Sequence, residues 1–181
     1  MNDSKITSRY AKALFDLALE TNKLKIVKND IDVIFKAVSE LPNFKEFINS
    51  PIIRASKKQE ILTNIFKQEV CDISLNFLNL IAHNRREMFL KLICLNFFTL
   101  YRKFMNIKQA EITTTRNIPN DFKNKIEEII KNIYKSEVEL EQKIDDSLIG
   151  GFIIKIDDKQ LDASVSTKLN NIKKELQNSI N

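Results

Sequence analysis

The sequence contains few residues that interrupt helices. It has two adjacent glycines, Gly150 and Gly151, and three prolines, Pro42, Pro51 and Pro119, in 181 residues. Average glycine usage of about 7% would give roughly 13 glycines in a chain of this length. This scarcity predicts long helices joined by short polar turns. It also excludes the phosphate-binding Walker loop and the dinucleotide fingerprint, because both need several glycines at fixed spacings.

Residues that could bind a metal or activate a nucleophile are also scarce. There is one histidine, His83, and the two cysteines, Cys71 and Cys94, lie in apolar runs without a Cys-x-x-Cys pair. A tetrahedral zinc site therefore lacks ligands, and no serine nucleophile motif accompanies His83. We expect His83 to lie at a helix end without a chemical role. Because no secretory signal is recognisable, we expect the cysteines to be reduced core residues of a cytosolic protein.

Long hydrophobic runs are missing as well. The longest stretch without Lys, Arg, Asp or Glu covers residues 73–84, and it includes serine, asparagine and histidine. Crossing a bilayer as a helix takes about 20 mostly apolar residues. We therefore expect no direct insertion into a membrane, so that any work at a membrane would need another subunit to hold the chain there.

The apolar spacing before residue 106 is that of helices. Apolar residues recur at three and four positions, which predicts six helices. The first has apolar residues on two neighbouring faces, so it must be contacted from more than one side. Ser56 with Gln59 matches a capping box at the start of the fourth. The other expected ranges are 23–40, 43–49, 72–84 and 86–105.

After residue 106 the pattern changes to short strands and two helices. Alternating and β-branched residues predict strands near 107–114, 138–144 and 152–156, and Pro119 is expected to open a helix that reaches Tyr134. The closing helix, about 163–179, has a narrow apolar seam suited either to covering the sheet or to meeting a partner helix: Val165, Leu169, Ile172, Leu176 and Ile180. The fold class expected is mainly α, with a six-helix bundle over 1–105 and a smaller α+β part over 106–181.

The positive charge belongs to the first part of the chain. Residues 1–105 hold 17 Lys and Arg against 11 Asp and Glu, whereas residues 106–181 hold 12 against 13. The basic residues are interleaved with acids rather than collected into one stripe. This arrangement favours a solvated surface that mildly prefers acidic partners, and it leaves a basic helical nucleic-acid binder as the alternative function.

Three segments resemble one family, the δ subunit of bacterial F-type ATP synthase, whose mitochondrial counterpart is the oligomycin-sensitivity-conferring protein. Residues 9–15, Arg-Tyr-Ala-Lys-Ala-Leu-Phe, are similar to the family's R-Y-A-x-A-L-F, and residues 76–86 resemble its N-F-L-x-L-L-x-x-N-x-R. The most specific match is the run Ile-Asp-Asp-Ser-Leu-Ile-Gly-Gly at 144–151, followed by Asp-x-Ser-Val at 162–165. Two departures are Asp146, where the family usually has proline, and basic residues that are only partly kept after residue 165, at Lys168, Lys173 and Lys174.

The resemblance implies a non-catalytic role in ATP synthesis. The helical part would sit on the catalytic head and take the amphipathic N-terminal helix of an α subunit between its first and fifth helices, while the C-terminal part would join the b-subunit stalk. The chain would then be a peripheral protein on the cytoplasmic face of the bacterial inner membrane, held there by the complex. Neither a cofactor nor nucleic acid is expected as a partner.

The same resemblance places the site residues. Tyr10 and Ala13 are expected on one wall of the groove and Phe77 and Leu80 on the other, with ordinary core packing as the alternative for all four. The seam residues Leu169, Ile172 and Leu176 are candidates for the stalk contact. Gly150 and Gly151 are assigned a structural turn rather than ligand binding, since a turn into a strand needs positive φ or close backbone approach.

Overall fold

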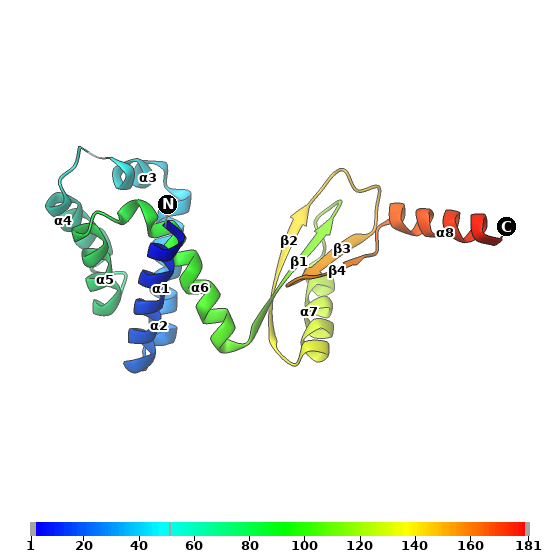
Figure 1. Ribbon diagram of the computed structural model, residues 1–181, viewed down its shortest axis with the longest axis horizontal. Helices are drawn as coiled ribbons and strands as arrows, with labels where there is room; N and C mark the ends of the chain where they lie inside the picture. Colours follow the sequence, from blue (N-terminus) through cyan, green and yellow to red (C-terminus); the bar gives the residue numbers. More distant parts are fainter. Residues whose placement is uncertain (1–2, 51, 180–181) are drawn as a thin grey trace. The chain divides into compact units, whose positions relative to one another are not determined.

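The chain forms two compact units, residues 1–103 and residues 104–181. The structure is a computed structural model that describes residues 3–50 and 52–179, with side chains from 4 to 50 and from 52 to 173. It is mainly helical and contains one small four-stranded sheet (Figure 1).

The first unit is built from helices that follow one another with short links. In chain order they are α1 (Asp3–Glu20), α2 (Leu24–Glu40), α3 (Pro42–Asn49), α4 (Ala55–Phe66), α5 (Asp72–His83), the 3-10 turn η1 (Glu87–Phe89) and α6 (Leu90–Met105). Pro42 occupies the first turn of α3, and Leu41 before it is extended at φ −99° and ψ 105°. Because proline disfavours the helical conformation of the preceding residue, α2 ends there.

The start of α4 differs from the predicted capping box. The helix begins at Ala55, and its N-cap residue, Arg54, makes no side-chain cap bond. The Gln59 side chain instead donates from Nε2 to the backbone oxygen of Asn79 on α5, 3.0 Å away. The predicted capping box was wrong because the helix starts earlier in the chain, so that Ser56 lies inside α4 and is not its N-cap. The expected sixth helix also begins differently, with the 3-10 turn η1 before α6.

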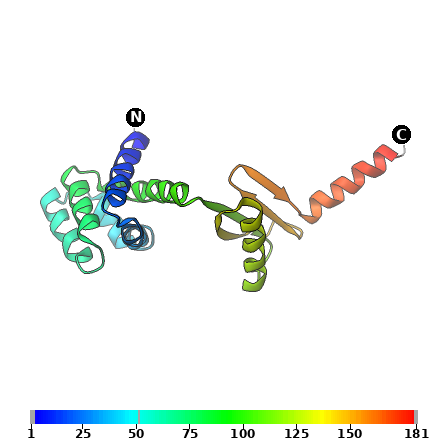
Figure 2. The same cartoon turned by 90° about the horizontal axis from the view of Figure 1, so that it is seen from below.

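The second unit is a four-stranded sheet with helices. Its elements are β1 (Ile107–Thr114), α7 (Asn120–Tyr134), β2 (Glu137–Ile144), β3 (Phe152–Ile156), β4 (Lys159–Asp162) and α8 (Val165–Ser179). The strand order is β2-β1-β3-β4, with β1 and β2 parallel and the other neighbours antiparallel. The helix α7 is the crossover that a parallel pair requires, and it lies against one face of the sheet (Figure 2). Strand β4 was not predicted, since its four residues are all exposed and show no alternation.

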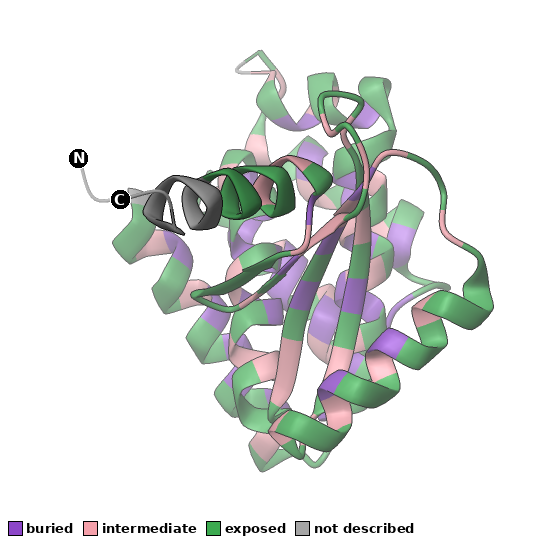
Figure 3. Ribbon diagram, turned by 90° about the vertical axis from the view of Figure 1, so that its right-hand side faces the viewer, coloured by how far each residue is buried: buried purple, intermediate pink, exposed green. Residues whose placement is uncertain are grey.

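The core of the second unit is small. Its buried members come from β1, α7, β2 and β3: Ala110, Ile112, Ile126, Ile130, Leu140 and Ile154. The three- and four-residue spacing of α7 predicts that Phe122, Ile129 and Ile133 lie inward. They are instead exposed, by 41%, 57% and 69%. A single helix has one face toward the sheet, so apolar residues beyond that face stay in solvent. The described turns of α8 are also mostly exposed (Figure 3).

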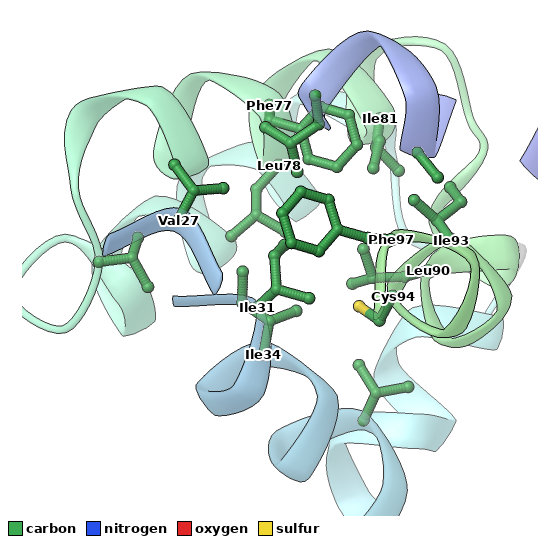
Figure 4. Close-up of a cluster of buried hydrophobic side chains, with 14 of the residues drawn as sticks. Val27, Ile31, Ile34, Phe77, Leu78, Ile81, Leu90, Ile93, Cys94 and Phe97 are labelled. Atoms are coloured by element: carbon green, nitrogen blue, oxygen red, sulfur yellow. The ribbon is translucent and has the colours of Figure 1, made fainter. Parts of the chain in front are cut away.

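The core of the first unit draws on most of its helices. Ile31 and Ile34 of α2, Leu78 of α5 and Ile93 and Phe97 of α6 are completely buried and converge in one cluster (Figure 4). Full burial of such a side chain contributes about 1.5–3 kcal/mol. The same spacing in these helices predicts further inward residues: Ile26, Ile65, Leu80, Leu92 and Phe104. These five are instead about half exposed, because the apolar stripes are wider than the contact.

Cys94 belongs to this core. It is fully buried, and burial raises the pKa of its thiol to about 12. The thiolate is the reactive form of cysteine, so Cys94 stays protonated and inert at neutral pH. Cys71 is half-buried at the N-terminal end of α5, so the expectation of a core residue holds fully only for Cys94. Both cysteines are free, and their reduced state in a cytosolic protein stays a prediction.

A buried carboxylate joins α2 to the start of α5. The Oδ2 atom of Asp30, a residue only 6% exposed, accepts bonds from the Cys71 backbone nitrogen at 3.0 Å and from the Ser74 hydroxyl at 2.6 Å. Cys71 is the N-cap of α5 and provides no side-chain cap of its own. Asp30 therefore satisfies backbone and side-chain donors in the first turn of another helix, where a negative charge also meets the favourable end of the helix dipole.

Candidate partner-binding groove

A groove runs between α1 and α5. It encloses about 430 Å³ and is lined by Arg9, Tyr10, Ala13, Leu14, Leu17, Ile73, Asn76, Phe77 and Leu80. All four residues expected from the family resemblance, two from each helix, lie in this lining. Apart from Arg9, Asn76 and the Tyr10 hydroxyl, the lining side chains are apolar. The structure therefore brings the predicted residues together in one apolar depression.

The two faces of α1 have different surroundings. Ala11, Leu14, Phe15 and Ala18 are buried in the core, whereas Ala13 is exposed and Leu17 is 45% exposed toward the groove side. The small side chain of Ala13 leaves space where a larger one would fill the depression. One apolar face of α1 therefore packs into the core, whereas Ala13 and Leu17 of the other face stay exposed beside the groove.

The α5 wall is also divided between core and surface. Phe77 is 7% exposed and packs edge-to-face against Tyr10, with ring centroids 6.4 Å apart, whereas Leu80 is 50% exposed. Phe77 is therefore a core residue that also forms the floor of the groove, so the alternative of ordinary packing holds in part for Phe77. Leu80 is the apolar residue of this wall that is most available to a partner.

The ends of the groove can be told apart. The Tyr10 hydroxyl accepts a 3.1 Å bond from Nδ2 of Asn84, the residue that follows α5, while Leu17 and Ile73 line the groove farther along α1 and at the start of α5. The helices α1 and α5 therefore run antiparallel along the groove. Sequence reasoning did not select Arg9, Leu17, Ile73 or Asn76. Two of them could have been found from the sequence. Arg9 precedes Tyr10 in the first motif, and Leu17 lies seven positions after Tyr10 on the same side of the helix.

The groove has no arrangement for acid-base or metal chemistry. Across the residues that the structure describes, no group of three or more His, Cys, Asp or Glu side chains could hold a metal ion. Within the same residues, no helix is long and apolar enough to cross a membrane. His83 is the last residue of α5 and is exposed, so its expected place at a helix end is confirmed. Its lack of a chemical role stays a prediction.

The glycine pair lies at a crowded turn. Gly151 has φ +82°, and a Cβ atom built on it would lie 2.5 Å from the backbone oxygen of Ala163. A Cβ on Gly150 would lie 3.2 Å from Cγ2 of Val165, and the Val165 nitrogen donates to the Gly150 oxygen at 3.0 Å. The two most family-like stretches of the sequence, 144–152 and 162–165, therefore meet in space. The positive φ and the close approach are the features for which the glycines were predicted.

Two aspartates order the ends of this turn. Asp145 accepts from the Ser147 hydroxyl at 2.6 Å and from the Ser147 nitrogen at 2.9 Å, and these bonds hold the pKa of Asp145 below its usual value. Asp162 accepts from the Ser164 nitrogen at 2.8 Å and from the Thr167 hydroxyl at 2.9 Å. The Ser164 hydroxyl and nitrogen, followed by Thr167, likewise lower the pKa of Asp162. These carboxylates fix the turn and the start of α8.

The position with aspartate in place of the usual proline lies in the first of these turns. The Leu148 backbone nitrogen donates to the backbone oxygen of Asp145 at 3.3 Å. This bond closes a four-residue turn in which Asp146 is the second residue. Proline is favoured at that position because its fixed φ suits the turn. Here the two hydrogen bonds between Asp145 and Ser147 restrain the turn in place of the proline ring.

The apolar seam of α8 faces solvent where it is described. Leu169 is 57% exposed and Ile172 is 53% exposed. Of the two roles that the sequence left open, covering the sheet therefore does not hold for these two residues. The side chain of Leu176, together with residue Ile180, lies outside the described part of the chain.

Comparison with known proteins decides the family. Residues 6–176 match the family described as ATP synthase delta (OSCP) subunit. The chain belongs to this family. It is 36% identical over 173 residues to the ATP synthase subunit delta of Cytophaga hutchinsonii, with 96% of this chain and 94% of the relative covered. It is 33% identical over 174 residues to that of Picosynechococcus, with coverage of 96% and 94%.

A solved structure shares the fold. A chain in the cryo-EM structure of the Toxoplasma gondii mitochondrial ATP synthase hexamer superposes with a TM-score of 0.76 at 22% identity, covering 94% of this chain and 97% of that chain. Members of this family are non-catalytic, and this chain is a peripheral-stalk subunit of the ATP synthase complex. The expectation of a stator subunit is thereby confirmed, and nucleic-acid binding is not favoured.

Proposed function

We propose that the groove between α1 and α5 holds the amphipathic N-terminal helix of an ATP synthase α subunit, and that the second unit contacts the b subunit of the stalk. The helices α1 to α6 would act as one bundle that grips the catalytic head. The complex would keep the chain at the cytoplasmic face of a bacterial inner membrane. The observation that carries the proposal is the apolar groove, whose lining includes the four residues expected from the family resemblance.

The groove suits a helix for physical reasons. Helix-in-groove recognition depends on apolar residues at i, i+3, i+4 and i+7 of the guest entering an apolar depression. Burial contributes about 25 cal/mol per Å² of apolar surface, and a small wall residue such as Ala13 lets the guest backbone approach closely. The free energy of association is smaller than this sum because ordering the guest has a cost. A load-bearing contact therefore needs a long apolar strip, which Tyr10, Ala13 and Leu17 provide along α1.

The stalk contact is proposed for α8. Leu169 and Ile172 are exposed by more than half and are three positions apart on one side of the helix, and Leu176 continues their spacing. An exposed seam with alternating three- and four-residue steps is the pattern by which one helix packs along another. A b-subunit helix is a partner of that kind.

Titration calorimetry on the full chain tests the groove. A peptide with the N-terminal sequence of the cognate α subunit is expected to bind saturably at micromolar concentration. Leu80→Asp should weaken binding at least tenfold, because it places a charge in the apolar wall. Leu92→Asp is the matched control, since Leu92 is 48% exposed on α6 and does not line the groove. Tyr10→Asp should also abolish binding, with helical circular dichroism showing that the fold remains.

The outcomes separate the possible failures. No saturable heat, or equal losses in the Leu80 and Leu92 variants, would contradict the proposed groove. For the stalk, Leu169→Asp should reduce capture of a soluble b-subunit fragment, whereas Asn171→Asp, an exposed site off the seam, should not. If both variants captured the fragment equally well, the proposal that α8 contacts the b subunit would be wrong.

A further inference from the structure

Along most of α1, basic residues come before acidic ones, which is the reverse of the order that a helix favours. After Asp3, the helix carries Lys5 and Arg9 in its first half and Lys12 just past its middle, and Asp16 and Glu20 follow toward its end. The partial positive charge at a helix N-terminus favours acids there, and the C-terminus favours bases, each by about 0.3–1 kcal/mol in the terminal turns. Lys5 lies in the first turn and Glu20 ends the helix. A sequence that departs from a local rule in this way often does so for function.

Three of these charges lie along the side of α1 that includes the groove residue Arg9. Arg9 belongs to the lining, at the end where Tyr10 meets Asn84. Asp16 and Glu20 follow Arg9 by seven and eleven positions, so all three lie along one side of α1. All three are exposed. The side of α1 that includes the groove residue Arg9 is therefore positive at the Arg9 end and negative at the other.

We propose that the groove selects the direction of its guest, an amphipathic helix that runs parallel to α1. Its acidic side chains, near its N-terminus, lie beside Arg9, and its basic side chains, near its C-terminus, lie beside Asp16 and Glu20. This inference rests on the proposed function of the groove. A guest with the usual order of charges, acids first and bases last, is stable as a helix and complements the reversed order of α1 in this direction only.

The charges, and not the helix dipoles, distinguish the two directions. Because α1 and α5 run antiparallel, a guest helix in either direction is parallel to one wall and antiparallel to the other, so the two dipole interactions largely cancel. In the other direction, the acids of the guest would face Asp16 and Glu20, and its bases would face Arg9. Like charges brought together at a complex are costly and suppress that arrangement.

A spin-labelled peptide shows in which direction the guest helix lies in the groove. The probe is a synthetic amphipathic peptide of about 18 residues, the length of α1, with blocked ends, glutamates in its first turn and lysines in its last. A nitroxide is attached to it at either end before mixing with the ¹⁵N-labelled full chain. We expect a label at the N-terminus to broaden the amide signals of Tyr10 and Asn84. A label at the C-terminus should broaden those of Leu17 and Ile73.

Charge reversal gives a second, independent readout. Arg9→Glu should weaken binding of this peptide about fivefold or more, and replacing the peptide's first-turn glutamates with lysines should restore affinity for Arg9→Glu alone. Lys12→Glu is the matched control, because it makes the same charge change on an exposed residue of α1 that does not line the groove.

The results distinguish this inference from the function on which it rests. Binding with the two broadening patterns exchanged, or equal losses for Arg9→Glu and Lys12→Glu, would overturn the direction and leave the groove in place. No saturable binding of either this peptide or the α-subunit peptide would overturn both.

Discussion

Asn84 donates a hydrogen bond from Nδ2 to the Tyr10 hydroxyl oxygen, 3.1 Å away, and so joins the residue after α5 to the first half of α1. The bond is exposed, and the ring of the same tyrosine contacts Phe77 edge-to-face. Two residues 74 positions apart thus fix one end of the groove. The groove exists because α1 and α5 are held side by side at that end.

Tyr10→Phe removes this bond and keeps the ring. We expect the free energy of unfolding to fall by about 0.5–1 kcal/mol, the usual net value of an intramolecular hydrogen bond. Urea denaturation of the full chain measures it. Tyr101→Phe is the control, because no hydrogen bond of the Tyr101 hydroxyl is found among the described residues. A loss as large in the control would show that the Asn84 bond is not the cause.

Asp30→Ala should be much more costly. It removes a buried carboxylate that accepts two bonds at the start of α5, and the Cys71 nitrogen and Ser74 hydroxyl are left without their acceptor. We expect a loss of about 3 kcal/mol in the free energy of unfolding. Asp32→Ala on the same helix breaks only the partly exposed pair with Lys28 and should cost about 0.5 kcal/mol. Equal denaturation midpoints for the two variants would contradict this role of Asp30.

Gly151→Ala should disrupt the C-terminal turn. The φ of +82° is unfavourable for alanine, and the new Cβ would lie within 2.5 Å of the Ala163 oxygen. Because backbone must move to relieve this contact, we expect a loss of more than about 2 kcal/mol. Gly150→Ala meets only a side-chain atom of Val165 at 3.2 Å and should cost less. Amide exchange in β3 and β4 measures both, and similar protection in the two variants would contradict the assignment.

Asp145 should give a measurable pH dependence. Bonds from the Ser147 hydroxyl and nitrogen lower the pKa of its carboxyl in the folded chain. A lowered folded-state pKa stabilises the fold above the unfolded value of about 3.9, and this stabilisation is lost as the pH falls through the folded-state pKa. The turn should therefore loosen below about pH 4.

Ser147→Ala tests the cause, because it removes the shorter of the two bonds. The pKa of Asp145, followed by carboxyl NMR, should rise toward the ordinary value, while that of Asp162 stays in place because its own partners are Ser164 and Thr167. An unchanged pKa of Asp145 would show that the hydroxyl is not what lowers it.

The sequence by itself determined the class and order of most elements. Scarce glycine and proline predicted the long helices, and the three- and four-residue spacing and the alternation near Ala110 and Ile112 located helices and the first strand. These are local signals, since each depends on residues a few positions apart. Tyr10, Ala13, Phe77 and Leu80 came from motif resemblance, and the structure places them in one groove.

Only the tertiary structure decided which apolar residues are covered. Spacing gives the direction in which a side chain leaves its helix, but burial depends on what the chain brings opposite. Phe77 and Leu80 lie on one wall, yet one is core and the other half exposed. Likewise, Asp30 and Cys71 have no local relationship, and Gln59 bonds Asn79 instead of closing its own helix. Burial and bonding partners at these positions are set by contacts between distant segments, because such contacts depend on how whole helices pack.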